Sequence, residues 1–429
     1  MVPVMTQSVQ TIVQQAGQAA AAGRLVEAEA LWTEVRRLDP KNVQALYSLG
    51  VHALHRRDLR GALDFLSIAE SHAPGDPIVR MTTAVVFRDL GDREGEWRMI
   101  HAALESDAYC LPALLAKGAF LERQGDGPAA ATVYGHALTI LPDETRWPSS
   151  LRDQFLHART VVEADRQVLS DRLARDCTEA FEHLDDDEAA RWREAMSIAT
   201  GRSRPFPSVC NQLHVPRLPA IPFFDRGRFD WVQALEARTE AIREEMQAAL
   251  EDQAEAFIPY IGYRPGDPVN QWAELNHSRR WSTFALWRGG TPVQANLDRC
   301  PETAAALRAV EMAEIGGLCP NAMFSVLAPH TAIPPHNGET NARLVVHLPL
   351  VIPERCRYRV GFEHRTWRVG ETLIFDDTIE HEARNDSDDT RVVLIFDVWN
   401  PLLSSNERRM VQSMVSATRV HNGLPPGSD

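Results

Sequence analysis

Apolar residues in the first third of the chain recur at helical spacing, and the positions that interrupt them repeat every 34 residues. Three features share this period: a proline or its substitute, a small residue within an apolar segment, and a turn residue followed four places later by a mostly small one. The series are Pro40, Pro74, Ala108, Pro142; Gly50, Ala84, Gly118; and Arg24, Asp58, Asp92, Asp126, followed by Ala28, Ala62, Glu96, Ala130. The pattern predicts stacked helix pairs in which small residues allow close approach.

Two stretches carry the repeat most clearly, AGRLVEAEALWTEVRRLDPKNVQALYSLGVHAL and the weaker RDLGDREGEWRMIHAALESDAYCLPALLAKGAF. They resemble the tetratricopeptide repeat, and we expect such repeats over residues 8–142. The resemblance implies a concave surface that holds a peptide or protein partner. A helical spacer or dimerisation arm is the alternative interpretation.

Residues 143–219 are expected to form a connector, helical at first and then rich in proline. A single strong helix is predicted over RFDWVQALEARTEAIREEMQAALED. Apolar residues recur there at helical spacing, and many charged residues lie on the opposite face. After about residue 280 the period changes to that of strands, in NAMFSVLAP, ARLVVHLPLVI, RYRVGF, ETLIFDD and TRVVLIFDVW. Short strands with turn signals and no helix between them favour an antiparallel barrel or sandwich.

Composition restricts the class of protein. The chain has 429 residues, enough for two or three domains, and its formal net charge of -14 argues against nucleic-acid binding. The N-terminal stretch is too polar for a signal peptide, and we expect no membrane span. The six cysteines are scattered without a metal-binding or disulfide spacing, so we expect a reducing, cytoplasmic location.

Two histidines lie at the ends of predicted strands, His336 after TAIPPH and His381 after FDD. Facing one barrel interior, they could bind one Fe(II), Zn(II) or Cu(II) ion. By spacing alone, two surface turn histidines are the better explanation, because fifteen histidines make many such pairs. Polar residues within apolar strands favour a site, namely His347, Ser325 and Arg391, because a buried arginine needs an anion such as a dicarboxylate.

The segments HNGETNARLVVHLPLVIP, WRVGETLIFDDTIEHEARN and RVVLIFDVWNP resemble the aspartyl/asparaginyl β-hydroxylase family, as do RRWSTFALWRGG and FSVLAPHTAIPPH upstream. The resemblance covers residues 220–410, and residues 411–429 are left as a C-terminal tail. It implies an Fe(II)- and 2-oxoglutarate-dependent dioxygenase that uses O2. The predicted fold class is therefore multidomain α + β, an α-helical tetratricopeptide-like solenoid followed by a double-stranded β-helix, or jelly-roll, domain.

The resemblance also implies roles for individual residues. The catalytic iron is expected on His336 and His381, and Arg343 is expected to bind the carboxylate of the substrate. The contacts of 2-oxoglutarate fall on Trp281, Ser325, His347 and Arg391.

Gly338 and Val345 each occupy a position at which related oxygenases carry a charged residue. Most such oxygenases place an acidic ligand two residues after the first histidine, but this family has glycine there, as does this chain at Gly338. Asp376 and Asp377 are substitute carboxylates in principle, although turn formation explains an Asp-Asp pair at a strand end better. A second family arginine is replaced by Val345, which weakens the case for an acidic substrate.

The expected reaction is hydroxylation of a C–H bond, by family default the β-carbon of an Asp- or Asn-type residue in a peptide or protein. A small or carrier-bound amino acid is a further substrate class. The alternative function is a non-catalytic repeat adaptor whose barrel binds a metal or a dicarboxylate. A zinc hydrolase is disfavoured, because no glutamate stands in a clear general-base position.

Overall fold

The computed structural model describes residues 8–252 and 254–425 of the chain. They fall into two compact units that divide after His183. This division lies inside the segment predicted as a connector, and the predicted domain limits themselves stay predictions. Within the described residues, no helix is both long and apolar enough to cross a membrane.

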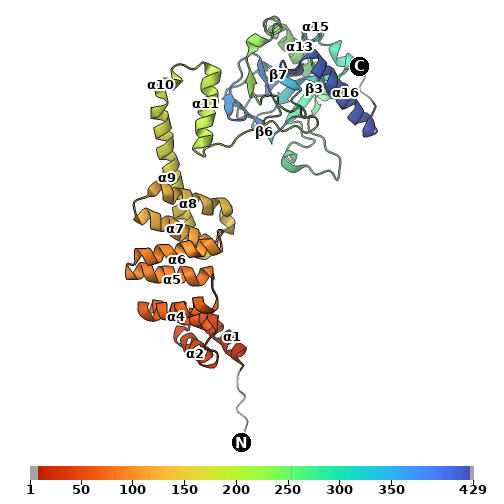
Figure 1. Cartoon of the computed structure of the whole chain (residues 1–429). Helices are drawn as coiled ribbons and strands as arrows, with labels where there is room; N and C mark the ends of the chain where they lie inside the picture. The colour runs from red at the N-terminus through yellow and green to blue at the C-terminus, as the bar shows by residue number, and fades with distance from the viewer. Residues whose placement is uncertain (1–7, 253, 426–429) are drawn as a thin grey trace. The chain divides into compact units, whose positions relative to one another are not determined.

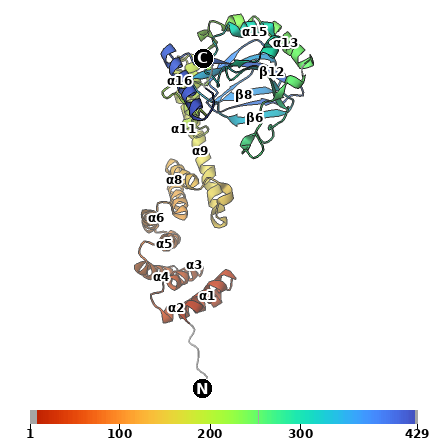
Figure 2. The same cartoon turned by 90° about the vertical axis from the view of Figure 1, so that its right-hand side faces the viewer.

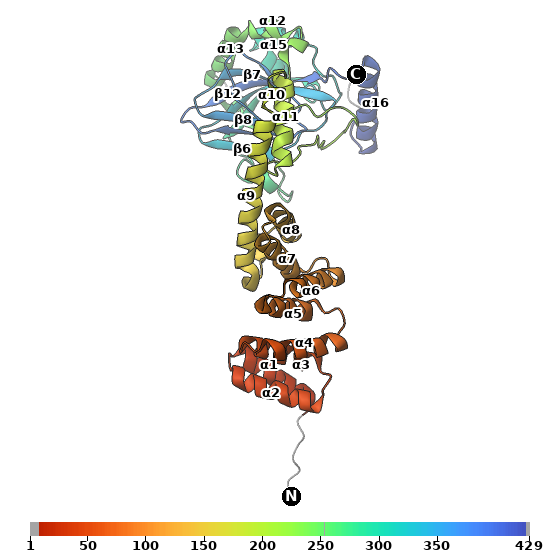
Figure 3. The same ribbon diagram turned by 60° about the vertical axis from the view of Figure 1, so that its left-hand side comes forward.

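The first unit consists of helices in which each packs against the next in the chain (Figure 1). Its helices are α1 (Val9–Ala21), α2 (Leu25–Leu38), α3 (Val43–His55), α4 (Leu59–His72), α5 (Pro77–Leu90), α6 (Arg93–Ser106), α7 (Leu111–Arg123), α8 (Gly127–Ile140), α9 (Arg152–Asp176) and α10 (Thr178–Phe181). The 25-residue α9 packs along α8 (Figure 3). The predicted tetratricopeptide-like helix pairs are confirmed.

The 34-residue period has a physical cause in this unit. The repeated aspartates Asp58, Asp92 and Asp126 cap the second helix of their pairs, since each side chain accepts a hydrogen bond from a backbone N–H three residues on. The repeated glycines lie where two helices meet. A Cβ at Gly50 would lie 2.9 Å from Leu66 of the partner helix, and one at Gly118 would overlap Tyr134.

The second unit is built around two antiparallel sheets, with α13 and α15 covering one side (Figure 2). The larger sheet has the order β1-β10-β7-β12-β5-β3-β2, with β4 paired to β3, and the smaller has the order β6-β11-β8-β9. The strands are β1 (Phe223–Phe224), β2 (Ile258–Pro259), β3 (Trp281–Arg288), β4 (Thr291–Pro292), β5 (Ala322–Leu327), β6 (Thr331–His336), β7 (Arg343–Val351), β8 (Cys356–Val360), β9 (Glu363–Arg365), β10 (Leu373–Phe375), β11 (His381–Asn385) and β12 (Arg391–Trp399). This arrangement agrees with the predicted jelly roll.

Helices complete the second unit. They are α11 (Asp186–Ala199), α12 (Val232–Glu236), α13 (Thr239–Asp252), α14 (Gln294–Leu297), α15 (Pro301–Arg308) and α16 (Ser405–His421). The helix α16 occupies much of the segment predicted as a tail, of which residues 426–429 lie outside the described part. The larger sheet packs one face against α12, α13 and α15, and its other face meets the smaller sheet in a second apolar cluster. A site between the sheets is therefore enclosed on both sides.

The prediction of one helix over residues 228–252 is wrong, because the segment breaks between Glu236 and Thr239. The hydroxyl of Thr239 donates to the backbone carbonyl of Glu236 at 2.7 Å, and the Glu236 carboxylate accepts from the backbone and hydroxyl of Thr372. Local side-chain hydrogen bonds of this kind compete with helix continuation.

Candidate functional site

A cavity of about 630 Å³ lies between the two sheets, and all the predicted site residues line it. This volume is within the range of small-molecule sites. The predicted residues on its wall are Trp281, Ser325, His336, Arg343, His347, His381 and Arg391. Gly338 and Val345 line it as well. Residues 110 positions apart in the sequence thus share one enclosed space.

The two histidines face each other across neighbouring strands. His381 of β11 pairs in register with His336 of β6, and their ring centroids are 4.0 Å apart. The Nδ1 atom of His336 lies 2.8 Å from the carbonyl oxygen of Pro334, and that of His381 lies 3.1 Å from the carbonyl oxygen of Ile379. A carbonyl oxygen only accepts, so each Nδ1 carries the proton. The lone pair of each Nε2 is left for another partner.

Both imidazoles are held in the neutral form that binds metals. Burial, followed by the nearby His381, lowers the pKa of His336 to about 3. Burial likewise lowers the pKa of His381 to about 4, with Arg343 adding to the effect. Neutral imidazole is the metal-ligating form of histidine. The pair therefore fits a divalent metal ion with two nitrogen ligands.

Gly338 has no room for a side chain, because an added Cβ would overlap the carboxylate of Asp377. The backbone N–H of Gly338 also donates to the carbonyl of Asp377 at 2.7 Å. Asp376 forms the expected turn, since its Oδ1 accepts from the backbone and hydroxyl of Thr378 at 2.9 and 2.5 Å. Within the described residues, no group of three or more His, Cys, Asp or Glu side chains is arranged for a metal ion.

One end of the cavity holds a buried cation without a counter-ion. Arg391 is 1% exposed, and neither its Nε nor its Nη1 atom has a hydrogen-bond partner among the described residues. Its guanidinium lies 4.3 Å from the ring centre of Trp367. Burial lowers the pKa of Arg391 to about 10. A buried guanidinium of this kind fits a carboxylate ligand.

Ser325 and His347 lie beside this arginine. Ser325 of β5 pairs with Val393, two residues from Arg391 on β12, so the two side chains share a face. The Ser325 hydroxyl accepts from Trp281 Nε1 at 3.1 Å, which leaves its own proton free to be donated. Trp367 Nε1 donates to His347 Nδ1 at 3.3 Å. Since burial and then Arg391 lower the pKa of His347 well below its ordinary value, its ring is neutral with a proton on Nε2.

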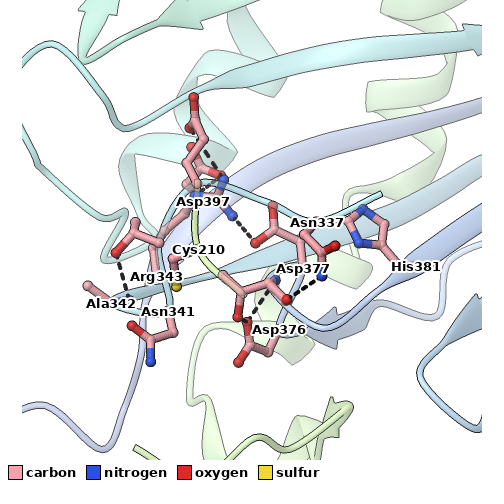
Figure 4. A network of polar contacts seen from close by, with 12 residues as sticks. Cys210, Asn337, Asn341, Ala342, Arg343, Asp376, Asp377, His381 and Asp397 are labelled. Atoms are coloured by element: carbon pink, nitrogen blue, oxygen red, sulfur yellow. Dashed lines mark hydrogen bonds and ion pairs between the residues drawn. The ribbon is translucent and has the colours of Figure 1, made fainter. Parts of the chain in front are cut away.

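The other end of the cavity holds a cation with many counter-ions. The Nη1 of Arg343 lies 2.8 Å from Asp377 Oδ1, its Nε lies 3.2 Å from Asp397 Oδ1, and its Nη2 lies 3.6 Å from Glu339 Oε2. Figure 4 shows the guanidinium between Asp397 and Asp377, with His381 beyond Asp377. Burial would lower the pKa of Arg343, but Asp377 and Asp397 raise it well above its ordinary value.

Several residues at the site escaped sequence reasoning, among them Tyr358, Asp397 and Trp367. Tyr358 and Asp397 line the cavity, and Trp367 contacts both Arg391 and His347. Asp397 stands in the apolar strand RVVLIFDVW, the same signal that identified His347. Tyr358 stands between Cys356 and Val360 in CRYRV, where alternation places all three on one face. Trp367 lies outside a strand and gave no such signal.

The repeat unit contains a cavity of its own, of about 730 Å³. Its wall comes largely from the first helices of successive pairs, α3, α5 and α7. Its apolar members include Val51, Leu54, Met81, Val85, Leu115 and Ala119. The predicted partner-binding surface thus has a candidate location.

Comparisons with known proteins identify the second unit. Residues 236–401 match the family model described as aspartyl/asparaginyl beta-hydroxylase. The chain is 28% identical over 308 residues to the mouse aspartyl/asparaginyl beta-hydroxylase, covering 68% of this chain and 39% of that protein. It is 37% identical over 195 residues to the ornithine lipid ester-linked acyl 2-hydroxylase of Rhizobium tropici, covering 45% and 65%. The chain thus spans about two fifths of its mouse relative.

Two of the solved structures that are similar to the chain are TPR proteins. YrrB, described as a TPR protein with an unusual peptide-binding site, is 16% identical with a TM-score of 0.28, covering 32% of this chain and 70% of that one. TTC0263, a TPR protein of Thermus thermophilus, is 18% identical with a TM-score of 0.30, covering 45% and 100%.

Proposed function

We propose that residues 236–401, which match the aspartyl/asparaginyl beta-hydroxylase family model, form an Fe(II)- and 2-oxoglutarate-dependent dioxygenase that hydroxylates a C–H bond. The proposal rests above all on Arg391. A cation that is 99% buried and lacks a carboxylate partner is costly to the fold, and it has a purpose if an anion joins it. The two neutral histidines of the same cavity supply a metal site beside that anion.

The proposed reaction gives a role to each of several residues that line the cavity. His336 and His381 would hold iron through Nε2, because their Nδ1 atoms are committed to backbone carbonyls. Arg391 and the Ser325 hydroxyl would bind the distal carboxylate of 2-oxoglutarate, and Trp281 positions that hydroxyl. Bound iron, with 2-oxoglutarate and O2, would supply the oxidising chemistry and release succinate and CO2.

The chain's own contribution is to position these groups and exclude water. His347 would donate its Nε2–H to the carboxylate next to the keto group of 2-oxoglutarate, and Trp367 Nε1, which donates to its Nδ1, fixes this tautomer. Tyr358, 2% exposed, and Phe375, 1% exposed, pack on its ring at centroid distances of 5.2 and 4.8 Å. Charge-assisted hydrogen bonds are stronger in such a dry site than in water.

A peptide or protein is the proposed substrate, and the apolar groove of the repeats is the proposed place where it is held. The Asp- or Asn-type residue remains the reference target, because it is named in the description of the family. The name of the Rhizobium tropici relative adds a lipid acyl chain as a second class. The cytoplasmic location stays a prediction.

The test is succinate release from 2-oxoglutarate by the full chain, loaded with Fe(II) without oxygen and then exposed to O2. His336→Ala should abolish both release and metal binding, because one of two protein ligands is removed. His364→Ala, which changes an exposed histidine on β9, is the matched control and should retain both. If wild-type protein binds metal and 2-oxoglutarate but never releases succinate, with or without candidate peptides, the non-catalytic adaptor is favoured.

A further inference from the structure

The three carboxylates around Arg343 leave little of that cation for a ligand. Each of its three side-chain nitrogens lies within ion-pair distance of a carboxylate oxygen of the chain, from Asp377, Asp397 or Glu339, although neither Nε nor Nη1 forms a hydrogen bond among the described residues. Asp397 is further held by Asn321, whose backbone N–H donates to it at 2.7 Å. A substrate carboxylate here would be the fourth anion on one guanidinium.

The second cation expected in this family is missing at the same place. Val345 lies in register with Asp397 across β7 and β12, is 7% exposed, and brings no charge. When all groups are ionised, the cluster of Arg343, Asp377, Asp397 and Glu339 has three negative charges and one positive charge. Burial raises the pKa of Asp397 and of Glu339 despite Arg343, so a further positive charge would stabilise both carboxylates.

An aromatic wall lines the same cavity as these carboxylates. Tyr260 and Trp281 lie 4.2 Å apart between ring centroids, and Trp272 lies 6.0 Å from Trp281 and 4.9 Å from His336. Burial, followed by the negative charge of Glu339, raises the pKa of Tyr260 to about 12, although 47% of this residue's surface is exposed. The wall is therefore close to the acidic cluster, and solvent reaches it.

Carboxylates combined with aromatic faces bind cations. Ammonium and guanidinium groups are attracted by the faces of tryptophan and tyrosine, and by carboxylates that lack a full complement of positive charge. A substrate carboxylate would instead meet like charges directly, which disfavours it strongly. Glu339 is the accessible member of the cluster, with 38% of its side chain exposed.

We propose that the substrate carries an ammonium or guanidinium group, as in the side chain of lysine or arginine, which lies against Glu339 and Asp377 beside the two histidines. The inference rests on the proposed function and specifies its substrate. It replaces the predicted role of Arg343, which becomes a structural centre that orders the acidic cluster. A hydroxylated carbon close to a cationic group then takes the place of the β-carbon of aspartate.

The experiment uses the full chain with Fe(II), 2-oxoglutarate and O2, and peptide libraries with one fixed central residue in random flanks. Fixed lysine, arginine, asparagine and aspartate are compared by the mass gain of one oxygen atom. We expect the lysine or arginine library to give at least tenfold more product than the aspartate library. Free L-lysine and L-arginine are tested beside them, and product from these alone assigns the cation to a small molecule.

Glu339→Gln should reduce the preference for the cationic library about tenfold, whereas Glu371→Gln, a change at an exposed glutamate outside the cavity, should leave it unchanged. Equal or better use of the aspartate or asparagine library overturns the inference, as does an unchanged preference in Glu339→Gln. Succinate release without substrate is followed in parallel. If it persists while no cationic substrate is hydroxylated, the inference fails and the proposed function stands; if it is absent in every reaction, the proposed function fails.

Discussion

Two buried arginines line one cavity, and their surroundings are opposite. Arg391 has no carboxylate partner among the described residues, and burial lowers its pKa to about 10. Arg343 faces three carboxylates, which raise its pKa well above the ordinary value. Both residues are less than 5% exposed, so burial alone does not separate them.

The difference indicates which cation is available to a ligand. A buried charge without a partner destabilises the fold, and a protein retains it where an incoming anion compensates for it. A buried charge that is surrounded by carboxylates of its own chain stabilises them and is less available to a further anion, even though Nε and Nη1 of Arg343, like those of Arg391, form no hydrogen bond among the described residues. The same residue type therefore indicates a ligand-binding group at one end of the cavity and a structural group at the other.

The largest expected effect is on folding, in Arg343→Met. Removing the cation leaves Asp377 and Asp397 buried without the positive charge that they face, and breaking a buried ion pair in this way costs about 3–5 kcal/mol. Chemical denaturation of the apoprotein measures the loss. Arg384→Met, which removes an exposed arginine paired with Asp386, is the control and should change little. Equal stability of the Arg343→Met and wild-type proteins would contradict the structural role.

Unlike Arg343→Met, Arg391→Met should preserve the stability of the fold and weaken ligand binding. The apoprotein should be as stable as wild type or more stable, because an unpaired buried charge is replaced by an apolar chain of similar length. Affinity for 2-oxoglutarate should fall at least 30-fold, which corresponds to about 2 kcal/mol for a lost buried ion pair. Calorimetric titration without oxygen, with Mn(II) in place of Fe(II), measures the change.

Arg391→Lys refines this test. Lysine keeps the charge but loses the planar pair of donors, so we expect an affinity between those of Arg391→Met and wild type. Unchanged affinity in Arg391→Met would show that the anion binds elsewhere.

A third expected effect is a pH dependence of stability that comes from Asp376, a buried carboxylate that forms no ion pair among the described residues. Burial raises its pKa from 3.8 to about 6. Its ionisation therefore costs the fold nothing below the unfolded pKa; the cost grows as pH rises from the unfolded to the folded pKa and levels off above it. The shift of about two pH units corresponds to at most about 3 kcal/mol.

Asp376→Asn should remove that cost and keep the acceptor for Thr378. Its stability advantage over wild type should grow by about 1 kcal/mol between pH 5.5 and pH 8. Denaturation at both pH values tests this, and Asp389→Asn, at an exposed aspartate, controls for the change in charge. An advantage that shrinks with rising pH would refute the raised pKa.

Much of this architecture was predictable from sequence because it depends on local periodicity. The 34-residue series located the helix pairs, since their aspartates and glycines act within one pair. The polar residues within apolar strands located the site. The break after Glu236 was not predictable, because the group that Glu236 binds, Thr372, is more than a hundred residues away.

The different surroundings of Arg343 and Arg391 could not be predicted from the sequence either. Both are single cations at the start of apolar strands, and the sequence pattern treats them alike. Asp377 and Asp397 come to Arg343 from distant parts of the sequence, which the turn before β11 and the pairing of β7 with β12 bring together, whereas Glu339 lies four residues before it. Charge balance inside a barrel depends on such long-range pairing.

The smallest expected effect comes from restoring the missing cation, in Val345→Arg. The new guanidinium would lie opposite Asp397 and reduce the excess negative charge of the cluster from two to one. We expect the preference for cationic over acidic peptides to fall about tenfold, or about 1.4 kcal/mol. The change also adds bulk to a packed wall, so stability should fall by about 1–3 kcal/mol.

Val345→Met, which adds bulk without charge, separates these two consequences of Val345→Arg. If Met shifts the preference as far as Arg does, shape and not charge selects the substrate at this end of the cavity. If only Arg shifts it, the excess of carboxylates around Arg343 is the cause, and the two arginines differ in function because they differ in their counter-ions.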